Sequence, residues 1–248
     1  MKWINHLRNN RISSLNVRNA AFVSAVIVAG GKSTRMGGQD KMKVLLNGKT
    51  CLARTVSAFQ ASPLVSEIVL VAREDLRKEA YAACEGCNKV SRVIKGGEDR
   101  THSAYFGVMA VSKNVDIVLI HDGARPLISE AVIERVIDAA KRYHAAIPVV
   151  PVTDTIKIGA EGFVEQTPDR SGLFAVQTPQ GFQYELIYAA LKDAVEKALS
   201  LTDDAAAVER LGMRVRMVEG DTNNKKITTA VDIAIAEAIL RQTEGGQA

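Results

Sequence analysis

The sequence contains no apolar run of membrane-spanning length, little cysteine and little net charge. A transmembrane helix needs about 20 mainly apolar residues, and no such stretch occurs in the 248 residues, so we expect no membrane partner. The three cysteines are an odd number in a long chain, which argues against a disulfide framework and favours a cytoplasmic protein. A formal net charge of only +4 argues against a dedicated nucleic-acid-binding protein, so any anion site should be local.

Cys84 and Cys87 lie in the segment CEGC, which has the spacing of half a zinc site or of a redox motif. No second pair of Cys or His residues is spaced to complete a metal site, and the segment follows a helix-like stretch instead of starting one. We interpret the two residues as incidental thiols. Protein ligands for a metal are therefore unknown at this point.

Residues 1–22 are basic and contain no acidic residue, as in an organellar presequence, but they lack the apolar segment of a secretory signal. We predict a disordered or loosely docked extension there. From residue 23 onward, short β-branched runs alternate with amphipathic segments, which is typical of a parallel sheet covered by helices. The expected strands are VSAVIVA, EIVLVA, VSRVI, VDIVLI and AAIPVV. We predict a single α/β domain over residues 23–242, with a three-layer, mostly parallel, Rossmann-like sheet.

Residues 151–176 interrupt this alternation with two short strand-like runs and glycine turns, and they show no amphipathic helical pattern. We predict a protruding β-arm that is too small to form a core of its own. A second subunit is the simplest surface for it to pack on, so the arm predicts a homodimer.

The segment VIVAGGKSTRMGGQDKMKVLL begins at Val26 and joins an apolar strand to glycines and cations. The phosphate-loop motif would need glycine in place of Val26, and the dinucleotide-binding motif would need glycine in place of Lys32. A strand that ends in Gly30 and Gly31 still offers close backbone approach to an anion at the carboxyl edge of a sheet. Arg35 and Lys41 would add positive charge there.

Two further clusters follow strands in the same way. In KGGEDRTHS, Gly97 and Glu98 precede a helix that we expect to start near Asp99, and a nucleotide contact or a bare turn explains them equally well. In HDGARP, His121 and Asp122 end an apolar strand. The histidine is a candidate general base, although we favour a packed or orienting role because no nucleophile adjoins it. Farther on, Thr202 is expected to cap a helix, and Lys225 and Lys226 precede the last helix.

The motifs VAGGKSTRM, GGEDRTHS, HDGARP, PVTDTIK, TPDRSGL, QTPQ, TDDAAAVE and VEGDTNNKKIT occur in this order. Their combination resembles the GT-A-like nucleotidyltransferase superfamily, and more narrowly the 2-C-methyl-D-erythritol 4-phosphate cytidylyltransferase family, over residues 23–240. The resemblance implies a fold of the nucleotide-diphospho-sugar transferase type and transfer of CMP from CTP to the alditol phosphate, in non-mevalonate isoprenoid biosynthesis. It also implies Mg²⁺ or another divalent cation, and a homodimer in which each arm serves the partner's site.

The resemblance further implies roles for individual residues. The residues implied to face the triphosphate and act in catalysis are Arg35, Lys41 and Lys226. Those implied to form the CTP pocket are Ala29, Gly30, Gly31, Gly97, Glu98, Ser103 and Gly123. Those implied to bind methylerythritol phosphate are Asp122, Arg125, Thr155, Arg170 and Thr202.

The chain departs from the family pattern in one loop. Family members commonly have proline, lysine, glutamine and an aromatic residue where this chain has DKMK, residues 40–43. Lys43 is therefore an alternative to Lys41, as Lys225 is to Lys226, and Glu98 stands where aspartate is common. Ribitol 5-phosphate cytidylyltransferase and a non-catalytic nucleotide-binding protein of the same fold are the alternative functions.

Overall fold

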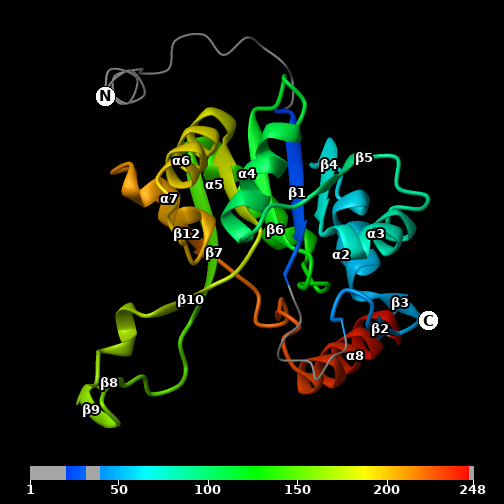
Figure 1. Cartoon of the computed structure of the whole chain (residues 1–248). Helices are drawn as coiled ribbons and strands as arrows, with labels where there is room; N and C mark the ends of the chain where they lie inside the picture. The colour runs from blue at the N-terminus through cyan, green and yellow to red at the C-terminus, as the bar shows by residue number, and fades with distance from the viewer. Residues whose placement is uncertain (1–20, 32–39, 246–248) are drawn as a thin grey trace.

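The computed structural model describes residues 21–31 and 40–245, with side chains to residue 243. Within these residues, an eight-stranded sheet has the strand order β10–β7–β11–β6–β1–β4–β5, with β12 beside β7 (Figure 1). Residues 1–20 of the extension predicted at the N-terminus lie outside the described residues. Arg35 also lies outside them. No helix in the described ranges is long and apolar enough to cross a membrane.

Four parallel strands form one half of the sheet. They are β1 (Val23–Ala29), β4 (Glu67–Ala72), β5 (Val90–Lys95) and β6 (Ile117–Asp122). All residues of β1, β4 and β6 are buried, as expected for strands covered on both faces. The strands predicted from the apolar runs are confirmed.

The other half contains β7 (Ala145–Pro151), β10 (Phe174–Val176), β11 (Gln180–Gln183) and β12 (Arg216–Glu219). Strand β11 runs antiparallel between β6 and β7, and β10 runs antiparallel beside β7, whereas β12 is parallel to β7. The sheet is therefore mixed but mostly parallel, which confirms the predicted class.

Helices cover both faces of the sheet, which makes three layers (Figure 1). Ala25 and Ile27 of β1 pack in one cluster, and the intervening Val26 and Val28 pack in the other. On the first face lie α2 (Cys51–Ala61), α3 (Arg77–Ala83), which follows the short helix η1 (Glu74–Leu76), and α5 (Glu130–Tyr143). On the second face lie α4 (Arg100–Ala110), α6 (Tyr184–Glu196) and α7 (Asp204–Arg210).

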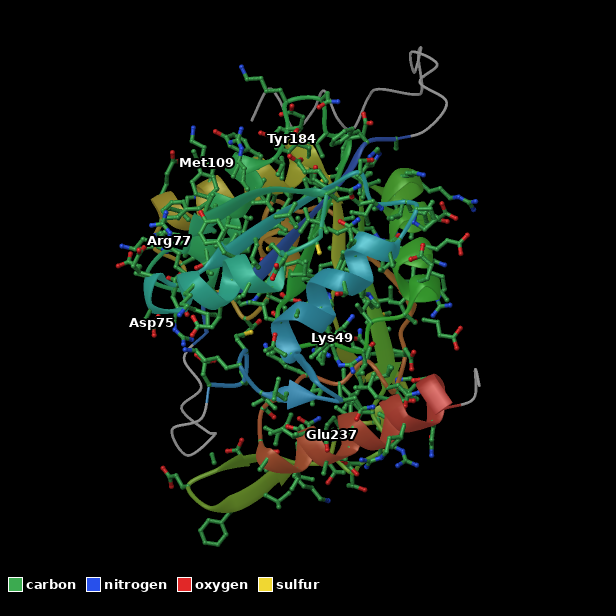
Figure 2. All side chains as sticks on the ribbon, turned by 90° about the vertical axis from the view of Figure 1, so that its right-hand side faces the viewer. Lys49, Asp75, Arg77, Met109, Tyr184 and Glu237 are labelled. Atoms are coloured by element: carbon green, nitrogen blue, oxygen red, sulfur yellow. The ribbon has the colours of Figure 1, made fainter. Side chains whose placement is uncertain are left out.

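The last helix, α8 (Ala230–Gly245), lies away from the sheet and forms a third apolar cluster. It packs against a hairpin of β2 (Leu45–Leu46) and β3 (Lys49–Thr50). Figure 2 shows this helix, with Glu237 labelled, beside the hairpin that carries Lys49. The cluster anchors the chain on both sides of the pocket described below, because it contains Val44 and Ile227.

The arm contains the hairpin β8 (Ile158–Ala160) and β9 (Phe163–Gln166), followed by the short helix η2 (Arg170–Gly172). It projects from the body of the chain (Figure 1). Phe163 is 79% exposed and Val164 is 62% exposed, so the arm has no core of its own. The predicted hairpin is confirmed, and the homodimer stays a prediction.

Candidate functional site

A pocket of about 600 Å³ opens at the carboxyl ends of β1, β4 and β6, where ligands of open α/β sheets bind. It brings together residues that lie far apart in the sequence. The predicted residues that line it are Gly30, Gly31, Lys41, Gly97, Glu98, Ser103, Asp122 and Lys226. The segment that begins at Val26, the KGGEDRTHS and HDGARP segments and the segment with Lys226 therefore meet at one site.

The loop before α4 forms one wall of this pocket. Asp99 caps the helix by accepting the His102 backbone N–H at 2.8 Å, so the predicted helix start is confirmed. Ser103 Oγ donates to the Asp99 carbonyl at 2.8 Å and accepts the Gly97 N–H at 3.1 Å. A Cβ added to Gly97 would lie 2.3 Å from the Cβ of His102, so only glycine fits at this turn.

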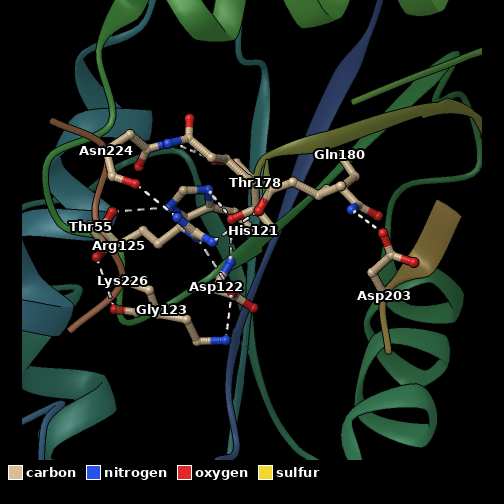
Figure 3. Close-up of polar contacts among 12 residues, drawn as sticks. Thr55, His121, Asp122, Gly123, Arg125, Thr178, Gln180, Asp203, Asn224 and Lys226 are labelled. Carbon is tan, nitrogen blue, oxygen red and sulfur yellow. Dashed lines mark hydrogen bonds and ion pairs between the residues drawn. The ribbon is translucent and has the colours of Figure 1, made fainter. Parts of the chain in front are cut away.

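Asp122 lies at the end of β6 and is surrounded by cations (Figure 3). Lys226 Nζ lies 2.8 Å from its Oδ2, and the Nε atoms of Arg100 and Arg125 each lie 3.5 Å from a carboxylate oxygen. Burial raises the pKa of Asp122, but Lys226 and Arg100 lower it more, and the pKa ends well below its ordinary value. Asp122 is therefore ionised at neutral pH and holds Lys226 at the pocket wall.

Arg100 is a pocket residue that was not singled out from the sequence. It begins α4 and donates to both carboxylate oxygens of the buried Asp204, at 2.9 and 2.8 Å. Gln180 Oε1 accepts the backbone N–H of Asp204 at 3.1 Å, which fixes the start of α7. Arg100 lies within the quoted motif GGEDRTHS, but its main partner is 104 residues away, and no local pattern indicates that pair.

His121 is a packed histidine, which confirms the packed or orienting role favoured from the sequence. It is fully buried, and its ring meets Phe59 edge-on, with centroids 4.8 Å apart. Nε2 lies 3.1 Å from the Arg125 carbonyl, which can only accept, so Nε2 carries the proton and Nδ1 accepts from the Thr178 hydroxyl at 3.0 Å (Figure 3). Burial lowers the pKa of His121 to about 4, so the ring is neutral and orients the loop after β6.

The structure separates each pair of alternative lysines. Lys41 lines the pocket, whereas Lys43 is paired with Glu79 at 2.5 Å on the exposed side of the turn. Lys226 lines the pocket and contacts Asp122, whereas Lys225 is exposed. The sequence alone left both choices open.

Arg73 is a second pocket residue missed in the sequence, where it directly follows β4. Its position at the end of a strand could have been used to predict it. Strand β4 adjoins β1, and the carboxyl ends of neighbouring parallel strands lie at the same edge of a sheet.

Other predicted residues lie near the pocket or away from it. Ala29 and Gly123 are buried behind its wall, where a Cβ on Gly123 would lie 3.2 Å from that of Ala29. Thr155 and Arg170 are exposed on the arm, and Arg170 Nη1 donates to the Thr153 carbonyl at 2.6 Å. Their binding roles stay predictions.

Thr202 is exposed and does not cap α7, so that part of the sequence interpretation was wrong. Asp203 is the cap instead, because its carboxylate accepts the Ala206 N–H at 3.0 Å, one residue farther along the chain than expected. Thr202 directly precedes the capping residue, and its role in substrate binding stays a prediction.

The cysteines behave as free thiols. Burial raises the pKa of Cys51 to about 12 and that of Cys84 to about 11, so neither is an activated nucleophile at neutral pH. The described residues contain no group of three or more His, Cys, Asp or Glu side chains arranged to hold a metal ion.

Comparisons with known proteins agree on one family. The family model described as IspD, 2-C-methyl-D-erythritol 4-phosphate cytidylyltransferase, matches residues 23–242. A protein of that name from Caldanaerobacter subterraneus subsp. tengcongensis is 44% identical over 89% of this chain and 99% of its own length. One from Alkaliphilus oremlandii is 42% identical over 93% of this chain and all of its own length.

Solved structures agree with these relatives. The 4-diphosphocytidyl-2C-methyl-D-erythritol synthase of Anaerococcus prevotii matches with a TM-score of 0.80 at 31% identity, over 89% of this chain and 99% of that one. The 2-C-methyl-D-erythritol 4-phosphate cytidylyltransferase of Thermus thermophilus matches with a TM-score of 0.72 at 33% identity, over the same shares of the two chains.

Proposed function

Because the chain belongs to the 2-C-methyl-D-erythritol 4-phosphate cytidylyltransferase family, we infer that the pocket at the carboxyl edge of its sheet is where CTP and the alditol phosphate meet. The enzyme transfers CMP from CTP to 2-C-methyl-D-erythritol 4-phosphate, a step of isoprenoid biosynthesis. The observation that carries the assignment to this pocket is the gathering of Lys41, Arg100 and Lys226 around it, with the glycines of two strand-end loops between them.

The chemistry follows from these charges. A phosphate oxygen of the alditol phosphate attacks the α-phosphorus of CTP, a new P–O bond forms, and the bond to the β-phosphate breaks to release pyrophosphate. The attacking oxygen is already an anion, so no base is needed, and the neutral, buried His121 has no proton-transfer role. Lys41 and Lys226 stabilise the charge that builds on the phosphates, which is the main task of the protein in such a transfer.

The remaining sequence assignments extend this proposal. The turns at Gly30, Gly31 and Gly97 bring backbone N–H groups close to the nucleotide, and Glu98 and Ser103 offer hydrogen-bonding groups to its base and ribose. Arg35, which lies outside the described residues, is proposed to add charge at the triphosphate.

We propose that a divalent cation binds in this pocket together with the substrate phosphates. Magnesium is usually held by one or two carboxylates together with substrate phosphates, and the lining includes the carboxylates of Asp122, Glu98 and Asp99. We propose that Asp122 is the protein group nearest to the ion. When bound, the ion would supply further positive charge to the triphosphate oxygens.

The choice of alditol phosphate distinguishes the proposed activity from that of a ribitol 5-phosphate cytidylyltransferase. We expect pyrophosphate release from CTP and Mg²⁺ to be at least about 100-fold faster, in kcat/KM, with methylerythritol phosphate than with ribitol 5-phosphate, because misplaced reacting atoms lose that much rate. A coupled pyrophosphate assay with each alcohol phosphate in turn measures this. Release with ribitol phosphate alone would refute the assigned substrate, and CTP binding without release would favour the non-catalytic alternative.

The arm supports a proposal of a homodimer with shared sites. Thr155 and Arg170 lie on a hairpin whose apolar residues Phe163 and Val164 are exposed in the single chain. We propose that the arm packs on a second copy and places Arg170 at the partner's pocket, where it binds the alditol phosphate bidentately.

Mixing two inactive variants tests this arrangement. Arg170→Ala and Lys41→Ala are each expected to be inactive. After the subunits are exchanged, a mixed dimer has one intact site, so activity should return to about a quarter of wild type for random pairing. Sedimentation would verify the dimer and the exchange. Failure to regain activity in verified mixed dimers would refute the shared site.

A further inference from the structure

Arg73 connects two segments of the pocket wall. Its side chain is 20% exposed, and its Nη1 donates to the Gly31 carbonyl at 3.0 Å. Its Nη2 donates to the carboxylate of Asp40, and its Nε donates to Asp75 at 2.7 Å. One guanidinium thus joins the backbone just after β1 to the turn that carries Lys41.

Asp40 in turn shapes that turn. Its Oδ1 accepts the Met42 N–H at 3.0 Å, and its carbonyl accepts the Lys43 N–H at 2.9 Å. Met42 is only 3% exposed, and its carbonyl accepts the Leu52 N–H. Lys41 therefore lies between a residue held by Arg73 and a residue held in the core.

The Lys41 ammonium lies close to the backbone segment that Arg73 contacts. A Cβ added to Gly31 would lie 3.9 Å from Lys41 Nζ, so the ammonium group is beside the backbone that Arg73 also contacts. Asp40, the first residue of the DKMK loop, is paired with a cation, and its charge is offset next to the proposed triphosphate site.

We propose that Arg73 acts on Lys41 through Asp40: it neutralises the Asp40 carboxylate, so that the positive charge of Lys41 stays available to the nucleotide. This inference rests on the proposed role of Lys41. Loss of Arg73 would leave a carboxylate without its main counter-ion beside an incoming triphosphate. Loss of both charges together would remove the repulsion.

The test compares Arg73→Gln, Asp40→Asn and the double variant in steady-state kinetics. Arg73→Gln should lower kcat/KM for CTP about 30-fold and leave KM for the alditol phosphate within about twofold. Asp40→Asn alone should stay within about threefold of wild type, because its amide oxygen still accepts the Met42 N–H. The double variant should recover to within about threefold of wild type, a strong departure from additivity.

Three results would overturn the inference. They are a wild-type kcat/KM in Arg73→Gln, a double variant no better than Arg73→Gln, and an Asp40→Asn variant as impaired as Arg73→Gln. The second would indicate that Arg73 contacts the nucleotide itself. If Arg73→Gln does not fold, the double variant decides, since impairment equal to that of Lys41→Ala contradicts the inference.

Two further variants are measured in the same assay, Arg77→Gln and Lys41→Ala. Arg77→Gln is the matched control, because Arg77 is on the outside of the same region, near Asp75, and pairs only loosely with Glu74 at 3.3 Å (Figure 2). It should keep wild-type kinetics. Lys41→Ala in the same assay tests the proposed role of that lysine separately: a wild-type rate there refutes the role, whereas an inactive Lys41→Ala with an unchanged Arg73→Gln refutes only the inference.

Discussion

Replacement of Lys41 by alanine is expected to lower kcat about 10²- to 10³-fold, or about 3–4 kcal/mol of transition-state stabilisation. The reason is its placement. Its ammonium lies beside Gly31 in the pocket, on a turn anchored by Asp40 and Met42. A preorganised cation stabilises charge that develops on the phosphates without reorganising during the reaction. Single-turnover measurement with saturating CTP reports this loss directly.

Lys43→Ala is the matched control for this prediction. Lys43 is two residues away and carries the same charge, but its ammonium is paired with Glu79 outside the pocket. Exposed pairs of this kind contribute little to stability, so both the fold and the rate should be retained. If Lys43→Ala were the inactive variant and Lys41→Ala the active one, the assignment of the DKMK loop would be reversed.

Lys226→Ala is expected to reduce kcat by a similar factor, about 10²-fold or more. Lys226 Nζ lies 2.8 Å from the buried carboxylate of Asp122, which holds the ammonium in the pocket before any nucleotide arrives. The substitution removes a cation and also leaves Asp122 with less compensation, because Arg100 and Arg125 are each 3.5 Å away. Both changes make the pocket less favourable for a triphosphate.

Lys225→Ala controls for the loss of charge at this place in the chain. Lys225 is exposed and does not line the pocket, so its removal should change kcat by less than about twofold. Thermal unfolding of both variants checks that the segment before α8 stays folded. A Lys226→Ala enzyme with kcat within threefold of wild type would remove this lysine from the mechanism.

Much of the fold could be predicted because its strands are buried on both faces. The runs that became β1 and β4 are apolar throughout or nearly so, and such runs indicate a covered parallel sheet without any knowledge of the partners. The start of β6 was harder to predict. Val115 was included in the run, but the strand begins at Ile117. The carboxylate of Asp116, just before the strand, accepts the Phe22 N–H at 2.7 Å.

The candidate site was predictable only where chemistry follows a strand directly. Gly30 and Asp122 stand at strand ends in the sequence, and the structure places both in the pocket. Arg100 was missed because its carboxylate partner, Asp204, is distant in sequence. Arg73 directly follows β4, so its place at a strand end could have been used to predict it. The choice between Lys225 and Lys226 depended on which side chain the turn directs toward Asp122, and adjacent residues of one type carry no such signal.

In the proposed reaction, this pocket transfers the α-phosphoryl group of CTP, with its cytidine, to 2-C-methyl-D-erythritol 4-phosphate. The most direct test uses CTP labelled separately at the α- and γ-phosphates and the purified full chain with Mg²⁺. We expect the α-label to move into the diphosphate of the cytidylyl product while the γ-label leaves in pyrophosphate, and we expect Lys41→Ala and Lys226→Ala to slow both. An α-label found in free CMP, or a γ-label found on the alditol phosphate, would contradict it.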